Sequence, residues 1–189
     1  MIQYIAIIIV GIFYLAYFAK MLGQRKRGIQ TSQLGKGNKV KRTMYIEVTL
    51  SITTTVIVFV MIASIYLNTS LISSSVVRYI GILLIGAGTI VFITAMITMQ
   101  DSWRAGIPQE EKLQIVTRGI YRFSRNPAFL GFDLTYIGAC VAFGNAVLIV
   151  VSIIAITMMH LQIVEEERYL ESVFGSDYLM YKSKVRRYM

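Results

Sequence analysis

Two short polar segments, each at the border of an apolar run, carry the side chains most able to do chemistry. Residues 117–131 read T-R-G-I-Y-R-F-S-R-N-P-A-F-L-G, which places three arginines and Asn126 ahead of a proline and an apolar stretch. The second segment is the acidic run Glu165-Glu166-Glu167. Polar groups beside lipid are costly unless they are paired or bind a ligand. We therefore expect a site that faces a soluble ligand on one side and a lipid-like ligand on the other.

The composition is typical of a small polytopic membrane protein. Of the 189 residues, 56% are hydrophobic, and the mean hydropathy is +0.62, which is too apolar for a soluble domain of this size. The net charge of +9 comes from basic residues between apolar runs, a pattern that indicates membrane topology rather than nucleic-acid binding. The single cysteine, Cys140, excludes an intrachain disulfide and a cysteine-based zinc cluster, and we expect no metal.

The apolar runs predict five transmembrane helices, of which the fourth is short. They are Ile2–Leu22, Tyr45–Leu67, Val76–Met99, Pro127–Phe143 and Ala146–Val164. The predicted fold is all-α, a polytopic membrane helical bundle that forms a single domain over residues 1–189. Residues 1–99 supply three spans, and residues 100–189 supply a cofactor-binding loop, a helical hairpin and a cytoplasmic tail that starts as a helix.

The basic residues predict the orientation of the bundle. The N-terminus has no basic residue ahead of the first apolar run, and Lys20 and Arg25 come near its end, which is the wrong polarity for a cleaved signal peptide. We expect a retained first span with the N-terminus outside. Every lysine and arginine except Arg78 then falls on the cytoplasmic side, as the positive-inside rule requires. The predicted site lies on that side.

The dipeptide Gly144-Asn145 is a turn signal that folds the last two spans into an antiparallel hairpin. Residues equidistant from the turn then lie at equal depth, within about one helical turn, or ~5 Å. Asn126 is level with Ile163 by this count. The polar segment before the fourth span and the acidic run after the fifth are therefore expected to meet at one membrane surface.

Asn126 and Pro127 have the residue types of a helix start. Proline suits the first turn, where its missing N–H costs nothing, and asparagine is a preferred N-cap. The free N–H groups of such a start favour a carboxylate or phosphate ligand. Taken singly, basic residues at the end of a span are usually topology anchors and an acidic run after a span is usually a solvated helix start, so the functional interpretation rests on their shared location.

Asp133 and His160 are ionisable residues inside predicted spans at similar depth, about a turn apart. An ionisable residue within a span is a functional candidate. The alternative is a buried hydrogen-bonded pair that holds the hairpin together. The sequence leaves both interpretations open.

Over residues 100–188 the chain resembles the isoprenylcysteine carboxyl methyltransferase family, which is related to the phospholipid N-methyltransferases. The family motifs read roughly L-V-T-x-G-x-Y-x-x-x-R-H-P-x-Y-x-G and E-E-x-x-L-x-x-x-F-G-x-x-Y-x-x-Y. The residues that match the first motif are Ile115, Val116, Thr117, Gly119, Tyr121, Arg125, Asn126, Pro127, Phe129 and Gly131. Those that match the second are Glu166, Glu167, Leu170, Phe174, Gly175, Tyr178 and Tyr181.

The resemblance implies a small helical membrane bundle that binds S-adenosylmethionine from the cytosol and a lipid-like methyl acceptor from the bilayer. The run Ser102-Trp103-Arg104 is similar to bacterial members, so we expect a prokaryotic cell membrane. Three features depart from the pattern: Asn126 stands where the family usually has histidine, Phe129 where it has tyrosine, and the tail around Arg187 lacks the family's proline. Asparagine keeps a donor and an acceptor but carries no proton at neutral pH.

The resemblance also suggests roles for individual residues. Catalytic roles are expected for Glu167, Arg187 and Asn126, with Arg187 orienting an acidic group of the acceptor. Cofactor-binding roles are expected for Arg104, Val116, Gly119, Tyr121, Arg125, Asn126, Pro127, Phe129, Gly131, Glu166 and Glu167. Arg125 or Arg104 would pair with the methionine carboxylate, and the two glutamates would bind its ammonium or the ribose hydroxyls.

Methyl transfer from a sulfonium to a carboxylate needs two positioned, desolvated substrates and no base, which fits a chain without a Ser-His-Asp set or a metal cluster. We expect carboxyl O-methylation of an isoprenylcysteine-like acceptor. The alternatives are N-methylation of a phospholipid or another membrane-partitioned small molecule, a sterol-reductase-like protein with a nicotinamide cofactor, and a non-catalytic scaffold.

Overall fold

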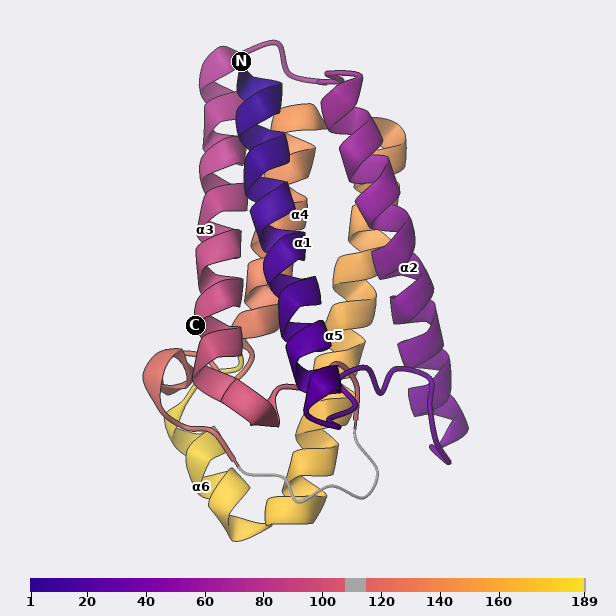
Figure 1. The fold of residues 1–189 in the computed structure, drawn as a ribbon, viewed down its shortest axis with the longest axis vertical. Helices are drawn as coiled ribbons and strands as arrows, with labels where there is room; N and C mark the ends of the chain where they lie inside the picture. Colours follow the sequence, from indigo (N-terminus) through magenta and orange to yellow (C-terminus); the bar gives the residue numbers. More distant parts are fainter. Residues whose placement is uncertain (108–114, 189) are drawn as a thin grey trace.

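A computed structural model describes residues 1–107 and 115–188 and confirms the all-helical fold (Figure 1). The helices are α1 (Ile2–Lys26), α2 (Lys41–Tyr66), α3 (Ser75–Met99), α4 (Pro127–Phe143), α5 (Ala146–Phe174) and α6 (Ser176–Lys184), with short 3-10 turns η1 (Gln100–Ser102) and η2 (Gly119–Arg122). Within the described ranges, the β contact is an isolated parallel bridge between Ser32 and Ala105. That bridge joins the two loops beside the ends of α1 and α3.

Four helices, α1, α2, α3 and α5, are long and apolar enough to cross a membrane, and the chain is an integral membrane protein. The fourth predicted span, α4, has its predicted bounds but only 17 residues, or about 26 Å against the ~30 Å of a hydrocarbon core. In contrast, α5 has 29 residues and a length of about 43 Å. Its last turns therefore extend past the membrane and carry the acidic run, as predicted for the start of the tail.

One end of the bundle, where α1, α3 and α5 finish and α2 and α4 begin, carries the basic residues of the described chain, and we call it the basic end (Figure 1). Lys112 lies outside the described residues. The exception, Arg78, lies at the opposite end, where its Nε donates to the carbonyl oxygen of Ala142 at 2.9 Å and its guanidinium sits 5.0 Å from the ring centroid of Phe143. These contacts fix Arg78 on the α4–α5 turn.

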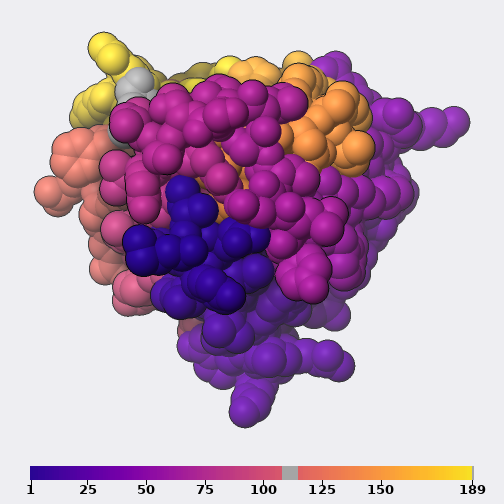
Figure 2. Space-filling view, turned by 90° about the horizontal axis from the view of Figure 1, so that it is seen from above, coloured from indigo at the N-terminus to yellow at the C-terminus, as the bar shows by residue number. Residues whose placement is uncertain are grey.

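At the opposite end, the start of α1, the segment between α2 and α3 and the α4–α5 turn lie close together (Figure 2), and side-chain hydrogen bonds join them. Gln3 at the start of α1 donates from Nε2 to the carbonyl oxygen of Ile65 at 3.0 Å. Asn145 caps α5 by accepting from the backbone N–H of Leu148 at 3.0 Å, and its Nδ2 donates to Ser64 Oγ at 2.8 Å. The predicted turn between α4 and α5 is confirmed, and one asparagine satisfies both the turn and the end of α2.

The closest helix pair is α3 with α4, which touch through glycines on both sides. A Cβ on Gly88 would lie 2.6 Å from the carbonyl oxygen of Gly131, and a Cβ on Gly81 would lie 2.6 Å from that of Gly138. Small residues of this kind let two helices approach backbone to backbone, as is common inside membranes. The two crossings are seven residues apart on each helix, so they hold α4 against α3 over about 10 Å of its length.

The other helices arrange around this pair. Phe13 of α1 stacks on Phe92 of α3 with ring centroids 4.3 Å apart, and α5 packs chiefly on α2. The helices α4 and α5 therefore form the predicted antiparallel hairpin, but each packs mainly on a different partner. Because α4 and α5 pack on different partners, a space remains between the α3–α4 and α2–α5 pairs, and the cavity of the candidate site lies in it.

The Gly88–Gly131 crossing makes a prediction with an internal control. In Gly88→Ala the added methyl has no room, so we expect the free energy of unfolding to fall by about 1–3 kcal/mol. Gly86, on the same helix, has no atom within 4 Å of an added Cβ, and Gly86→Ala should stay within about 1 kcal/mol of the parent or exceed it. Thermal unfolding of both variants in one detergent compares them. Equal behaviour would contradict the close contact.

Candidate functional site

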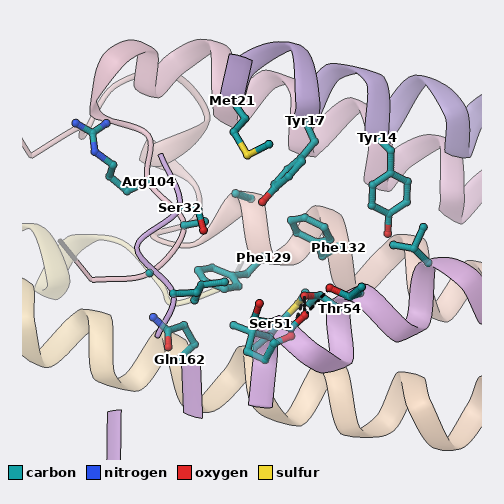
Figure 3. Close-up of a pocket in the computed structure, with 18 of the residues that line it drawn as sticks. Tyr14, Tyr17, Met21, Ser32, Ser51, Thr54, Arg104, Phe129, Phe132 and Gln162 are labelled. Carbon is teal, nitrogen blue, oxygen red and sulfur yellow. Dashed lines mark hydrogen bonds between the residues drawn. The ribbon is translucent and has the colours of Figure 1, made fainter. Parts of the chain in front are cut away.

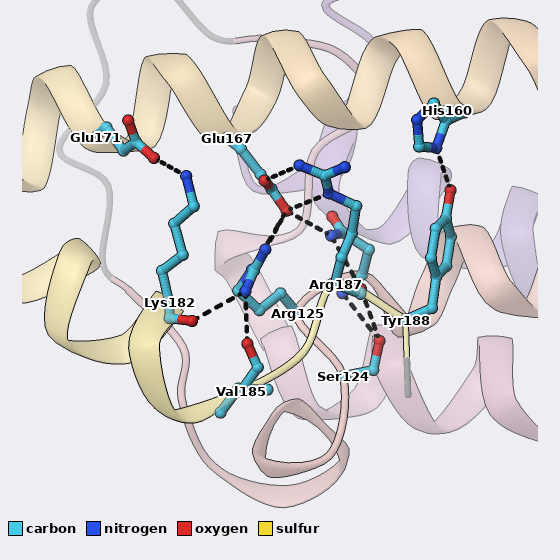
Figure 4. Close-up of polar contacts among 10 residues, drawn as sticks. Ser124, Arg125, His160, Glu167, Glu171, Lys182, Val185, Arg187 and Tyr188 are labelled. Atoms are coloured by element: carbon cyan, nitrogen blue, oxygen red, sulfur yellow. Dashed lines mark hydrogen bonds and ion pairs between the residues drawn. The ribbon is translucent and has the colours of Figure 1, made fainter.

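Glu167 of α5 is the centre of a charge cluster at the basic end (Figure 4). Its Oε1 accepts from Arg125 Nη2 at 2.9 Å, from Arg187 Nε at 3.1 Å and from Asn126 Nδ2 at 3.3 Å. Its Oε2 accepts from Arg187 Nη2 at 2.8 Å. The side chains of Glu167 and Arg125 are only 4% and 8% exposed. A buried carboxylate with two cationic partners is stable only because its lone pairs are filled in this way.

The same cluster fastens the tail to the start of α4. Arg125 donates from Nη1 to the carbonyl oxygen of Val185 at 2.5 Å. The backbone N–H of Arg125 donates to the carbonyl oxygen of Arg186 at 3.0 Å. Asn126 Nδ2 donates to the carbonyl oxygen of Arg187 at 3.2 Å. Asn126 is the N-cap residue of α4, as predicted, and its carbonyl oxygen accepts from the backbone N–H of Leu130 at 3.1 Å, but its side chain makes no capping hydrogen bond. Its amide is turned instead toward Glu167 and the tail.

Charge pairing and burial raise the pKa values of one arginine and two tyrosines at the basic end. The hydrogen bond to the Glu167 carboxylate raises the pKa of Arg187 above its usual value. Burial raises the pKa of Tyr121 strongly and that of Tyr181 to about 12. The neutral Tyr181 hydroxyl donates to the carbonyl oxygen of Tyr121 at 2.7 Å, which ties α6 to η2. Hydrogen bonds thus join η2, α6 and the tail at the basic end.

The three glutamates of the acidic run have three different hydrogen-bond partners, because successive residues of a helix point about 100° apart. Glu165 accepts from Thr43 Oγ1 of α2 at 2.9 Å. Glu166 accepts from Gln162 Nε2 at 3.0 Å. Among the contacts of the described residues, Glu167 alone of the three joins the segment before α4, whereas the hairpin argument predicted this meeting for the run as a whole.

A cavity of about 360 Å³ lies between the α3–α4 and α2–α5 pairs, with α1 along one side (Figure 3). Its lining is mostly apolar and aromatic. The lining includes Tyr14, Phe18, Thr54, Phe59, Arg104, Phe129, Tyr136 and Gln162. Phe18 of α1 and Phe59 of α2 are 48% and 70% exposed, so the cavity reaches the outer surface of the bundle between these helices. Its shape suits an amphipathic guest.

The basic end of the cavity is covered by two loops that a buried carboxylate holds in place. Glu47 of α2 accepts from Lys39 Nζ at 2.5 Å, from the backbone N–H of Gly35 at 2.8 Å and from that of Ile107 at 3.0 Å. The Ser32–Ala105 bridge joins the same loops. The sequence analysis missed Glu47, although its position as the single acidic residue within the second predicted span was the available signal.

The structure divides the predicted site residues between two places. Arg125, Asn126, Glu167 and Arg187 come together in the cluster, and Arg104 and Phe129 line the cavity. The remaining ones surround these two places: Val116 is half-buried, Gly119 lies against Thr98, Tyr121 is buried, Pro127 is the buried first residue of α4, Glu166 contacts Gln162, and Gly131 lies in the contact with α3.

Asp133 and His160 do not form the pair that one interpretation proposed. His160 Nδ1 lies 2.8 Å from the hydroxyl of Tyr188 in the tail, and Oδ1 of Asp133 is buried without a hydrogen-bond partner among the described residues. Both side chains line a shallow groove on the outer face of α4 and α5. Across the described part of the chain, no three His, Cys, Asp or Glu side chains converge to hold a metal ion.

The fold and the site define a class: an integral membrane bundle with a charge cluster at one end and an amphiphile-sized cavity open toward lipid. Comparison with known proteins identifies the family within this class. Residues 76–177, more than half of the chain, match the family described as phospholipid methyltransferase. The chain belongs to the phospholipid methyltransferase family.

Curated relatives carry a second name. The chain is 36% identical over 72 residues to a protein-S-isoprenylcysteine O-methyltransferase of Schizosaccharomyces pombe, covering 38% of this chain and 30% of that protein. It is 32% identical over 108 residues to protein-S-isoprenylcysteine O-methyltransferase B of Arabidopsis thaliana, covering 56% and 55%. A probable protein-S-isoprenylcysteine O-methyltransferase of Oryza sativa subsp. indica is 28% identical over 116 residues, covering 58% and 59%. The matches thus span less than two thirds of these relatives.

The charge cluster predicts a contrast between two glutamates of α5. Glu167→Gln leaves two arginines without their carboxylate, one of them buried, and should cost about 3 kcal/mol of stability or more and release the tail. Glu171 pairs with Lys182 where both side chains are about one third exposed, and Glu171→Gln should cost at most about 1 kcal/mol. Thermal unfolding and tryptic cleavage after Lys184 report the two effects. Equal tail protection in both variants would contradict the role of Glu167.

Proposed function

We propose that the protein is an S-adenosylmethionine-dependent methyltransferase that esterifies the carboxylate of a lipid-like acceptor in the cavity. The isoprenylcysteine O-methyltransferase names of its relatives support this acceptor class. The lipid-facing opening between Phe18 and Phe59 supports entry of an apolar tail from the bilayer. A carboxylate head would then lie at the basic end.

The observation that carries the proposal is the charge of the cavity lining. None of the described residues that line the cavity is Asp, Glu or His, and Arg104 is the single charged side chain among them. The Arg104 guanidinium donates from Nη1 to the carbonyl oxygens of Asp101 and Trp103 at 2.6 and 2.9 Å, so a carboxylate would have to bind beside these contacts. A guanidinium matches a carboxylate in geometry and charge. An amine acceptor would need a base to remove its proton, whereas a carboxylate is already nucleophilic. The lining therefore favours O-methylation.

A buried oxygen of Gln162 supports cofactor binding at the same end. Its Oε1 is buried without a hydrogen-bond partner among the described residues, while its Nε2 is used by Glu166. Such an oxygen fits a donor-rich group, as an ammonium or a ribose hydroxyl is. When bound, S-adenosylmethionine supplies a methyl group on a positively charged sulfur, which a carboxylate accepts without first losing a proton. Gln162 and Glu166 would hold the amino-acid or ribose part, and apolar neighbours such as Phe129 would exclude water.

Glu167, Arg187 and Asn126 were expected to be catalytic, and their contacts in the structure are with one another. We assign them a positioning role: they fix the start of α4 against the tail, next to the place proposed for the cofactor. Arg125 belongs to the same group rather than to the methionine carboxylate. The basic end would face the cytoplasm, where the cofactor is available, in keeping with the positive-inside distribution.

A second candidate acceptor is the amine of a phospholipid, which the family description favours. The two products differ chemically. A methyl ester is cleaved by mild alkali and releases methanol, whereas a methylated amine is stable. One assay with labelled S-adenosylmethionine therefore separates the two candidates.

The purified protein, in lipid nanodiscs, should transfer labelled methyl to N-acetyl-S-farnesylcysteine in an alkali-labile form. Arg104→Gln removes the carboxylate partner and should lower kcat/KM for this acceptor about tenfold or more, with little change in S-adenosylmethionine affinity. Arg118 is exposed and does not line the cavity, so Arg118→Gln is the matched control and should resemble the parent.

Three other results would contradict the proposal. Alkali-stable label in phosphatidylethanolamine would support the amine acceptor. Binding of NADPH in place of S-adenosylmethionine would support the reductase interpretation. Absence of any cofactor binding by calorimetry would indicate a scaffold.

A further inference from the structure

The inner part of the cavity contains two tyrosine hydroxyls whose hydrogen bonds are not satisfied. The hydroxyls of Tyr14 in α1 and Tyr136 in α4 are both buried and have no hydrogen-bond partner among the described residues. Tyr136 is only 1% exposed. Figure 3 shows the Tyr14 hydroxyl pointing away from α1 toward the part of the cavity that contains Thr54. A buried hydroxyl without a partner costs about 1–3 kcal/mol, so these two groups need an explanation.

Other side-chain hydroxyls at this depth donate hydrogen bonds to backbone carbonyl oxygens of their own helices. Thr54 Oγ1 donates to the carbonyl oxygen of Leu50 at 2.8 Å, and Thr135 Oγ1 donates to that of Gly131 at 2.8 Å. Short side chains can bond back in this way, but a phenol hydroxyl is held too far from its own backbone. Tyr14 and Tyr136 are neighbours, yet even a hydrogen bond between them would use only one of their two O–H groups. At least one O–H donor is then left without a partner among the described residues, beside the cavity that both tyrosines line.

The position of these hydroxyls separates them from the polar end of the cavity. Tyr136 lies nine positions after Pro127 in α4, or about 14 Å from the start of that helix and near the middle of a ~30 Å hydrocarbon core. Phe129, nearer the basic end, is about 10 Å away along the same helix. A guest whose carboxylate meets Arg104 therefore presents its tail, not its head, to the two tyrosines. The hydroxyls select for something in that tail.

We propose that the preferred acceptor carries an oxygen hydrogen-bond acceptor, such as a carbonyl, ether or hydroxyl oxygen, within its apolar tail, and that Tyr14 and Tyr136 recognise it. This inference rests on the proposed function for the identity of the head group. A purely hydrocarbon tail would leave at least one of the two O–H groups without a partner and keep its desolvation cost in the complex. An oxygenated tail removes that cost, because the remaining O–H group then donates to the ligand. The two tyrosines thus determine acceptor specificity at a distance from the reacting carboxylate.

The test compares two synthetic S-alkylcysteines of equal length, one with a saturated tail and one with a carbonyl about 10 Å from the carboxylate. That spacing equals the rise along α4 from Phe129, at the basic end of the cavity, to Tyr136. Binding to the protein in nanodiscs is measured by ligand-induced thermal shift, and methylation with labelled S-adenosylmethionine is measured in parallel. The wild type should bind the carbonyl compound about fivefold to tenfold more tightly, the factor that one hydrogen bond provides.

Phenylalanine variants test the assignment without emptying the cavity. Tyr136→Phe and Tyr14→Phe keep the rings and remove the hydroxyls, so the preference for the carbonyl tail should shrink in each and vanish in the double variant. Tyr79 is 44% exposed on α3 and outside the cavity, and Tyr79→Phe should keep the full preference.

Equal binding of the two tails by the wild type would overturn the inference, and so would failure to bind either one. A preference that survives in the double variant would overturn it as well, because the recognition would then come from other residues. Failure of the proposed function gives a different result: the binding preference and its loss in the variants would remain, while neither compound would be methylated. Methylation of both tails at equal efficiency would leave the function standing and remove the specificity.

Discussion

Backbone contact between α3 and α4 is the constraint on which the rest of the structure depends. Because Gly88 meets Gly131 and Gly81 meets Gly138, α4 is held to α3, although it is joined by a short turn to α5. The helix α5 packs instead on α2, and the space between the two pairs becomes the cavity. Glu167 reaches across the splayed hairpin at the basic end and closes it through Arg125. At the same end, the loops that Glu47 holds in place cover the cavity.

The features that the sequence predicted are those with local signals. Apolar runs, the proline at the start of α4 and the Gly144-Asn145 turn each specify structure within a few residues, and the predicted helices agree with the observed ones to within a few positions except where α1, α2 and α5 extend past the membrane. The meeting of Arg125 with Glu167 followed from the turn and the helix rise alone. Equal depth on a hairpin is a geometric consequence that needs no knowledge of packing.

The features that the sequence could not provide depend on which face of a helix meets which neighbour. Tyr14 and Tyr136 lie in apolar runs where a lipid-facing, a packed and a cavity-lining tyrosine look alike. The role of Gly131 depends on Gly88, more than forty residues away and without a shared motif. Asn126 lies at the cap position, but its Nδ2 donates to the Glu167 carboxylate and to the carbonyl oxygen of Arg187, and this orientation of the amide leaves Oδ1 without a capping hydrogen bond to α4.

The two loops that Glu47 holds in place affect the route by which a ligand could enter and leave the cavity. They lie over the polar end of the cavity, whereas Phe18 and Phe59 border an opening on the side of the bundle. A lipid-like guest would then enter and leave laterally through the bilayer, without crossing an aqueous phase. Its access would respond to the lipid composition and lateral pressure around α1 and α2 as well as to solution conditions.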